Sequence, residues 1–155
     1  MAESNGFAIR RMDKKDLGEV VSIAASSSLN PWSMNMFVEE VLNPIAHCFV
    51  VTRRRVLKHP LPLVGFICFR NIEDESELLN LCVHPEYRQS GIGKLLMQFY
   101  IDSCDKMKIR RFYLEVASSN QPAIHLYRSF AYQLAGIRKK FYREKFDALL
   151  MVKKG

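Results

Sequence analysis

The sequence predicts an α/β fold in which a mixed sheet is covered by helices on both faces. The chain has 155 residues, enough for one sizeable core and a single domain over residues 1–155. Its 48% hydrophobic and 25% charged residues are typical of a globular protein. Strand-like and helix-like segments follow one another in the order strand, two helices, three strands, helix, strand, helix and two strands. This order requires sheet and helix layers packed together.

The first third of the chain predicts one strand and two helices. Residues 7–12 (FAIRRM) alternate between apolar and polar side chains, as a half-buried strand does. Asp13 is the expected N-cap of the first helix, whose apolar face carries Leu17, Val20, Val21 and Ala24. Ser33 is the expected N-cap of the second helix, which lies within residues 31–41.

The rest of the chain predicts six strands and two helices. The strands are expected at residues 47–53, 63–72, 75–85, 110–116, 132–142 and 147–154. The first of these helices has an apolar face formed by Ile92, Leu95, Leu96, Phe99, Ser103 and Met107. Ser119 is the expected N-cap of the second, whose apolar side is formed by Ala123, Leu126, Tyr127 and Phe130.

Charge and composition narrow the classes of function. The 23 basic and 16 acidic residues give a net charge of +7, which favours a phosphorylated cofactor, an acidic surface or a nucleic acid as partner. No apolar run approaches the roughly 20 residues of a membrane span, and the N-terminus lacks the apolar segment of a secretion signal. We therefore expect a cytoplasmic protein with no membrane partner. The four cysteines are expected to be buried reduced thiols, and no metal site is expected, because the histidines lack ligand spacing.

The segment RQSGIGKLL (88–96) has the composition of an anion-binding loop between a strand and a helix. A P-loop is excluded because position 95 is leucine, where a magnesium-binding hydroxyl is required, and a dinucleotide fingerprint fits poorly because position 96 is not glycine. The pattern R-x-x-G-x-G from Arg88 to Gly93 remains, and its successive N–H groups suit a pyrophosphate. An ordinary strand-to-helix turn that needs glycine for positive φ fits these six residues equally well.

A second segment, LEVASSNQPAIHLY (114–127), favours the pyrophosphate loop. Together with LLNLCVHPEYRQSGIGKLL (78–96), it resembles the GCN5-related N-acetyltransferase (GNAT) superfamily, which binds acetyl-coenzyme A. NPWSMNMF (30–37) and GIRKKFY (136–142) are similar to a narrower branch, the bacterial ribosomal-protein-alanine N-acetyltransferases. The chain departs from that branch at Ala117 in place of arginine, at Ala131-Tyr132 in place of Gly-Phe, and at Phe141 in place of tyrosine.

The resemblance implies the GNAT fold, a central mixed and mostly antiparallel sheet of about seven strands with helices on both faces. It also implies acetyl-CoA as cosubstrate, with no metal. The positions that match the family's cofactor-binding residues are Leu81, Cys82, Val83, Arg88, Gln89, Ser90, Gly91, Ile92, Gly93, Lys94, Asn120 and Tyr127. In the family a backbone N–H of the strand before the loop, here around Cys82 or Val83, binds the acetyl carbonyl. Asn120 is also placed to cap a helix.

The resemblance further implies an acid and a base for acetyl transfer. Glu115 matches the general base, although a glutamate near a strand end also commonly forms an ion pair with a basic side chain. Glu77 is the alternative base. Tyr127 matches the general acid that protonates the leaving thiolate, although its helical position also suits a core residue.

The implied acceptor is the N-terminal α-amine of a protein, namely the alanine of the small-subunit ribosomal protein bS18. Trp32, Glu115 and Tyr142 are the expected acceptor-binding residues, and Trp32 alternatively suits the core. Lysine, polyamines and other small amines remain alternative acceptors, because fold does not fix the acceptor. A non-catalytic nucleic-acid-binding domain is the rival class. Most aromatic residues fall on apolar faces rather than among basic side chains, which counts against direct nucleic-acid binding.

Overall fold

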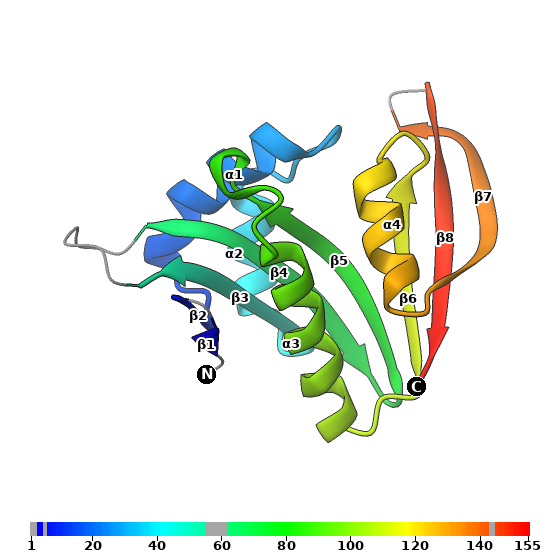
Figure 1. Ribbon diagram of the computed structural model, residues 1–155, viewed down its shortest axis with the longest axis horizontal. Coiled ribbons are helices and arrows are strands. Elements are labelled where there is room, and N and C mark those ends of the chain that lie inside the picture. The colour runs from blue at the N-terminus through cyan, green and yellow to red at the C-terminus, as the bar shows by residue number, and fades with distance from the viewer. Residues whose placement is uncertain (1–2, 5, 55–61, 143–144) are drawn as a thin grey trace.

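The structure is a computed structural model that describes residues 3–4, 6–54, 62–142 and 145–155. Its strands form one sheet in the order β1-β2-β3-β4-β5-β6-β8-β7 (Figure 1). Their bounds are Glu3–Ser4 (β1), Phe7–Arg11 (β2), Ala46–Arg53 (β3), Leu63–Ile72 (β4), Glu75–Val83 (β5), Arg111–Ala117 (β6), Gln133–Tyr142 (β7) and Phe146–Lys154 (β8). The seven longer strands confirm the predicted sheet, and β1 adds a two-residue strand at its edge.

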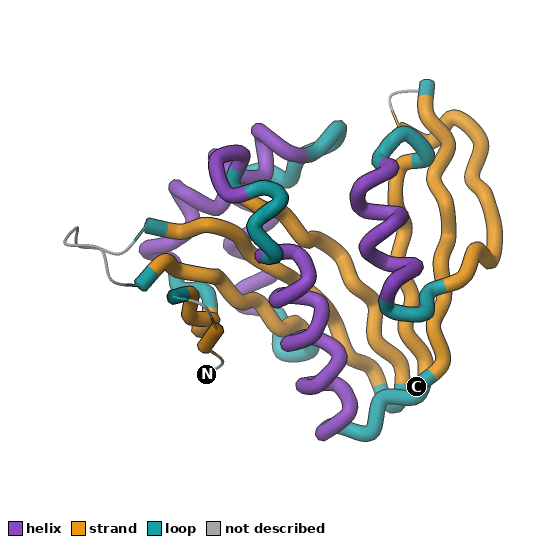
Figure 2. Tube along the Cα trace, in the orientation of Figure 1, coloured by secondary structure: helices purple, strands orange, loops and turns teal. Residues whose placement is uncertain are grey.

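Four α-helices cover both faces of the sheet, as predicted. They are α1 (Leu17–Ser27), α2 (Met34–Leu42), α3 (Ile92–Lys106) and α4 (Gln121–Ser129), and two short 3-10 helices, η1 (Lys14–Asp16) and η2 (Pro85–Tyr87), precede α1 and α3. Residues of α3 and α4 share one buried cluster with the sheet, and residues of α1 and α2 share the other. In Figure 2, α3 and α4 lie in front of the strands. No helix in the described ranges is long and apolar enough to cross a bilayer.

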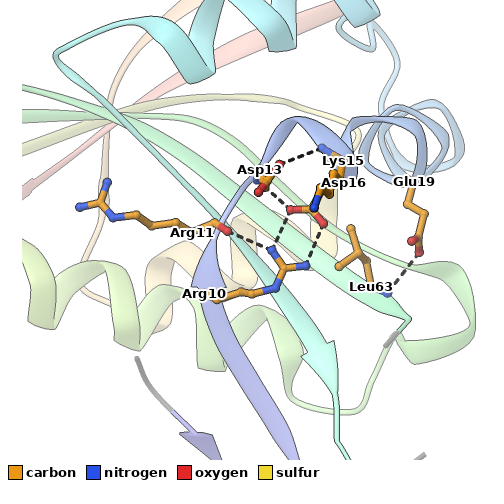
Figure 3. A network of polar contacts seen from close by, with 7 residues as sticks. All are labelled: Arg10, Arg11, Asp13, Lys15, Asp16, Glu19 and Leu63. Carbon is orange, nitrogen blue, oxygen red and sulfur yellow. Dashed lines mark hydrogen bonds and ion pairs between the residues drawn. The ribbon is translucent and has the colours of Figure 1, made fainter. Parts of the chain in front are cut away.

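A polar network precedes α1 (Figure 3). Asp13 was expected to cap the first α-helix, but it caps η1, the 3-10 turn that leads into α1, and the N-cap of α1 itself is Asp16. The Asp13 carboxylate accepts the Lys15 N–H at 3.0 Å, and the Asp16 carboxylate accepts the Asp13 N–H at 2.8 Å. Both terminal nitrogens of Arg10 donate to Asp16 at 2.8 Å. Burial by itself would raise the pKa of Asp16, but the hydrogen bonds from Arg10 and Asp13 outweigh it and hold this pKa below its usual value.

Two other sequence-based details of the helices were wrong. The predicted apolar face of α3 included Ser103 and Met107, but the buried side chains are Ile92, Leu96, Met97, Tyr100, Ile101 and Cys104, and Met107 is 42% exposed. The predicted row 95-99-103-107 and the buried row 92-96-100-104 have the same four-residue spacing, so the buried face is rotated about the helix axis toward Met97 and Ile101 by packing against the sheet. Ser119 does not cap α4; Asn120 does, accepting the Ala123 N–H at 3.2 Å. A cap at Ser119 would face Pro122 three residues on, which has no N–H to donate.

The sheet is mostly antiparallel, as predicted, and β5 and β6 form the parallel pair within its described strands. This pairing runs only from Glu75 opposite Arg111 to Leu78 opposite Leu114. Beyond it, β5 continues beside β4 alone and β6 beside β8 alone. The two halves of the sheet therefore start together near the C-terminus and diverge, as Figure 1 shows for β5 and β6.

Candidate active site

The separation of β5 from β6 begins at one position on each strand. On β5, Cys68 pairs with Asn80 and the next residue, Phe69, pairs with Leu78, so Leu79 is an extra residue that forms a β-bulge. A bulge bends its strand and increases the local twist, which turns β5 away from β6. On β6, Glu115 is the first residue after the last pair with β5. Leu79 and Glu115 thus stand at the closed end of the V-shaped opening.

The backbone groups of β5 that face this opening belong to alternate residues. His84 donates its N–H to the Val64 carbonyl of β4 at 2.8 Å, and a Cβ added to Gly65 of β4 would lie 2.9 Å from the Cys82 carbonyl oxygen. Cys82 therefore directs its backbone toward β4. Because backbone groups alternate along a strand, Leu81 and Val83 direct theirs toward the side that β6 has left. Of the two expected carbonyl-binding positions, Val83 fits this geometry and Cys82 does not.

The segment that follows β5 presents a row of backbone donors. Within the described residues, the N–H groups of Ile92, Gly93 and Lys94 in the first turn of α3 have no intrahelical acceptor, and they directly follow the turn of residues 88–91. Gly91 is the N-cap of α3 with φ +82°, a left-handed conformation that favours glycine, and residues 88 to 91 are exposed. Unpaired donors at the N-terminus of a 15-residue helix form an anion site, so these residues fit a pyrophosphate.

The start of α3 also approaches α4. A Cβ added to Gly93 would lie 3.2 Å from Leu126 Cδ2, closer than most side-chain contacts. Glycine at this position therefore lets α4 pack beside the anion-binding loop. The next residue on α4 is Tyr127, the predicted acid, so the structure brings it near the loop although 34 positions separate it from Gly93 in the sequence.

Tyr127 is a core residue as well as a candidate acid. Its side chain is 7% exposed, and its ring lies 5.9 Å from that of Tyr132. It belongs to the buried cluster that includes Leu114 and Val116 of β6, on the α4 face of the sheet. The two roles are compatible, because a buried phenol can still reach the adjoining opening with its hydroxyl.

Glu115 points to the opposite face of β6. Alternation along β6 separates it from the buried Leu114 and Val116 on the α4 side. Its carboxylate lies 3.3 Å from Arg138 Nη2 of β7, and its side chain is 33% exposed. The ion pair that the sequence left as the alternative for Glu115 is therefore present. It also places the basic tail residue Arg138 on the side of the candidate base, where its guanidinium lies 5.3 Å from the centre of the Phe141 ring.

The other predicted residues lie farther from the closed end of the opening. Glu77 is on β5 before the strands separate, opposite Arg70 on one side and Tyr113 on the other. Trp32 is half-buried, with its ring 5.2 Å from that of Phe37 in the connection to α2. Tyr142 is the last residue of β7, and its side chain lies outside the described residues.

The cysteines are free thiols, and three of the four are buried, in agreement with the prediction. Burial raises the pKa of the Cys82 thiol to about 12, so it is protonated at neutral pH. A protonated thiol is a poor nucleophile, which disfavours an acetyl-cysteine intermediate on Cys82, the cysteine of β5. The arrangement instead suits direct transfer between two bound substrates.

A separate surface pocket of about 720 Å³ lies where β2 and the end of β3 meet the segment of Glu86, Tyr87 and Ser90. It is lined by Gly6, Phe7, Arg53, Arg54, Glu86, Tyr87 and Ser90. It shares Ser90 with the loop, and no described residue of β5 or β6 lines it. It is therefore distinct from the opening between the strands.

Residues 8–132 match the model of the acetyltransferase (GNAT) family. The chain belongs to the GNAT family. It is an acetyl-CoA-dependent N-acetyltransferase.

Curated relatives narrow the similarity. This GNAT enzyme is 36% identical to a Bacillus subtilis (strain 168) protein provisionally named a ribosomal protein bS18-alanine N-acetyltransferase, over 93% of each chain. It is 29% identical to the Escherichia coli K12 protein of that name, over 92% of this chain and 94% of the relative. The crystal structure of the ribosomal-protein-alanine N-acetyltransferase from Escherichia coli superposes with a TM-score of 0.84 at 27% identity, covering 96% of this chain and 93% of that one.

Sequence reasoning did not identify Arg138 as the ion-pair partner of Glu115, and it missed the contact between Arg88 and Ser27. The Glu115–Arg138 pair crosses β8, and its partners are brought to one face only by the register of three strands. The Arg88 side chain donates to Ser27 at the end of α1, and Ser27 carries no motif that would single it out. The basic run at residues 138–140 was the one signal in the sequence that could have suggested a partner for Glu115.

Proposed function

We propose that this enzyme acetylates the N-terminal α-amine of a protein, and that its natural acceptor is the N-terminal alanine of ribosomal protein bS18. The observation that carries the chemistry is the position of Glu115, the first β6 residue beyond the last pair with β5 and on the face away from α4. The names of the Bacillus subtilis and Escherichia coli relatives support the acceptor. A ribosomal acceptor also agrees with the expected cytoplasmic location.

The proposed mechanism starts with the cosubstrate along β5. The N–H groups from Arg88 to Lys94 bind the pyrophosphate, and the backbone of Leu81 and Val83 lines the path of the pantetheine arm. A backbone N–H of this strand then donates to the acetyl carbonyl as negative charge develops on its oxygen. One such preorganised donor is worth about 3 kcal/mol in comparable oxyanion sites.

Glu115 is the proposed base. An α-amine has a pKa near 8, so a large share of it is protonated at neutral pH and cannot attack. The Glu115 carboxylate accepts this proton directly or through a water molecule. The Arg138 guanidinium already forms an ion pair with the Glu115 carboxylate at 3.3 Å, so an incoming ammonium group competes with Arg138 for that carboxylate. Once displaced, the Arg138 side chain can turn toward the acceptor.

Tyr127 is the proposed acid, and it donates its phenolic proton to the departing coenzyme A thiolate. Its position on the α4 face puts acid and base on opposite sides of β6. The acceptor therefore enters from the Glu115 side while the thiolate leaves on the Tyr127 side. Asn120 keeps its side-chain NH₂ available for the pantetheine arm while its oxygen caps α4.

The test is release of free thiol from acetyl-CoA with a panel of acceptors. The panel contains peptides that begin with Ala, Ser, Met or Gly, the bS18 N-terminal peptide, an N-terminally blocked peptide with an internal lysine, and a polyamine. We expect turnover with free N-termini and the highest kcat/KM with the bS18 peptide. Turnover confined to the blocked lysine peptide or the polyamine would refute the N-terminal proposal.

The residue roles are tested by Glu115→Gln and Tyr127→Phe, each of which should lower kcat more than tenfold with the fold intact. Glu75→Gln is the matched control, because Glu75 forms a similar surface ion pair, 3.7 Å from Arg111, at the start of β5 where the strands are still joined. Rates near wild type in both active-site variants would show that the base and acid are other groups, with Glu77 the next candidate base.

A further inference from the structure

The side chain of Arg88 points away from the proposed pyrophosphate site. Its Nη2 donates to the Ser27 hydroxyl at 2.9 Å and to the Ser26 carbonyl at 3.2 Å. Both acceptors belong to the last turn of α1, on the other face of the sheet from α3. The backbone of Arg88 is therefore part of the proposed anion-binding loop, whereas its guanidinium contacts a helix 61 residues earlier in the chain.

Ser27 joins the same contact to the cofactor strand. Its hydroxyl accepts from Arg88 and donates to the Val83 carbonyl at 3.4 Å. The three residues thus form a chain of hydrogen bonds from the anion loop through α1 to β5. We call Arg88, Ser27 and Val83 the loop clamp.

The clamp also satisfies the C-terminus of α1. The last carbonyls of a helix lack intrahelical partners and carry partial negative charge, and α1 has no basic residue in its last turn. Arg88 supplies the missing cation and a donor to the Ser26 carbonyl. The end of α1 is therefore held by a residue of the loop that binds the cosubstrate.

The connection from α1 to α2 starts at this point. Ser28, the C-cap of α1, already has extended backbone, and the connection runs to Ser33, the N-cap of α2. Trp32 fixes its far end by packing against Phe37. The near end is also held by the Ser28 N–H, which donates to the Ala24 carbonyl at 3.0 Å, and it begins one residue after Ser27, so the clamp adjoins residues 28–33 directly.

We propose that Arg88 is a positioning residue: through Ser27 it fixes the cosubstrate loop against α1, and acetyl-CoA binding in turn orders residues 28–33 for the acceptor. This proposal rests on the proposed assignment of the loop and of Trp32. It predicts that loss of the Ser27 hydroxyl weakens acetyl-CoA binding and that acetyl-CoA in turn slows amide exchange in residues 28–33, because the loop and this connection share one anchor.

The first experiment is calorimetric titration of acetyl-CoA into the wild-type enzyme and variants of the clamp. Ser27→Ala should weaken binding about fivefold, the equivalent of one net hydrogen bond of about 1 kcal/mol. Arg88→Ala should weaken it about tenfold or more, and the double variant should match Arg88→Ala alone, because both changes remove one contact. Ser27→Thr, which keeps the hydroxyl, should restore most of the affinity.

Ser22→Ala is the matched control, because it removes an exposed hydroxyl from the same helix away from the clamp, and its affinity should equal that of wild type. Wild-type affinity in Ser27→Ala together with weak binding in Arg88→Ala would overturn the clamp and assign Arg88 to direct phosphate contact. Absence of acetyl-CoA binding by the wild-type enzyme would instead refute the loop assignment, and the clamp with it.

The second experiment is amide hydrogen exchange of residues 28–33 with and without acetyl-CoA, a measurement that needs no acceptor. In the wild-type enzyme the cosubstrate should slow exchange in this segment, and at saturating acetyl-CoA the effect should be lost in Ser27→Ala and kept in Ser22→Ala. Equal slowing in Ser27→Ala and wild type would overturn the coupling.

Discussion

Ala131→Gly should stabilise the enzyme, because Ala131 holds a backbone conformation that suits glycine. Helix α4 ends in a Schellman motif: the Ala131 N–H donates to the Arg128 carbonyl at 3.0 Å, and the Tyr132 N–H donates to the Tyr127 carbonyl at 3.2 Å. Ala131 has φ +69°, in the left-handed region. The motif's usual hydrophobic contact is also present, with the Tyr127 and Tyr132 rings 5.9 Å apart. Glycine is also the usual residue at this position in the ribosomal-protein-alanine N-acetyltransferases that the sequence resembles.

The magnitude follows from two opposing terms. A left-handed residue with a Cβ costs roughly 1–2 kcal/mol, which glycine removes. Glycine also gives the unfolded chain more freedom, which costs about 0.4–1 kcal/mol. Ala131 is exposed, so the lost methyl group takes no core packing with it. The net gain is about 0.5–1 kcal/mol, which corresponds to a rise in Tm of about 1–4 °C for a chain of this size.

Urea unfolding followed by circular dichroism, together with calorimetric Tm, measures this change. Ala25→Gly is the matched control: Ala25 is an exposed residue within α1, where the same substitution should destabilise by about 0.5–1 kcal/mol. The two substitutions are chemically identical and should differ in sign. A lower midpoint for Ala131→Gly, or the same sign for both variants, would refute the assignment of a left-handed cap.

Three further predictions concern the loop, the start of α1 and the cofactor strand. Gly91→Ala adds a side chain at φ +82°, which strains the loop by about 1–2 kcal/mol and should weaken acetyl-CoA binding about 5–30-fold in a calorimetric titration. Gly18→Ala in α1 is the control and should leave the affinity for acetyl-CoA unchanged. Equal affinities of the Gly91→Ala variant and the wild-type enzyme would contradict the loop geometry. Asp16→Asn should cost about 2 kcal/mol in urea unfolding at pH 7, since it loses charged hydrogen bonds. Because the folded pKa of Asp16 lies below its unfolded value, its contribution is complete above the unfolded pKa and is lost as pH falls through the folded one, so the variant and wild type should converge in acid. Cys82, with a pKa of about 12, should resist alkylation by iodoacetamide at pH 8 in the folded enzyme. Double-reciprocal plots of initial rate against one substrate, at several concentrations of the other, should intersect. Alkylation of Cys82 together with parallel plots would indicate an acetyl-cysteine intermediate.

Features encoded within a few neighbouring residues could be predicted from the sequence. The caps at Asp13 and Ser33 depend on residues two or three positions away: Ser33 caps α2 as predicted, and Asp13 caps η1, the 3-10 turn before α1. The glycine loop was predicted for the same reason, because its conformation is set by Gly91 and the helix that follows. The predicted cap at Ser119 was wrong because of a local detail: the residue three positions later is Pro122, which has no N–H for a capping side chain to accept. This detail is visible in the sequence.

The orientation of side chains across the sheet could not be predicted in this way. Whether Glu115 and Tyr127 lie on the same side of β6 depends on strand register and on which face α4 covers. The α3 face was misjudged for a similar reason, because packing against the sheet selected the row that contains Leu96, Tyr100 and Cys104 in place of the neighbouring row with the same spacing. Periodicity gives the width of an apolar face and leaves its rotation to the packing partner.

The sequence by itself determined the helices, strands, caps and glycine loop of this protein, and through its motifs the GNAT family, because each of these depends on residues adjacent in the chain. Only the tertiary structure decided that β5 and β6 separate after Leu78 and Leu114, that Arg138 lies against Glu115, and that Arg88 reaches Ser27. The physical reason is that these contacts join residues 23 to 61 positions apart. Their formation depends on sheet order and register, which no short segment specifies.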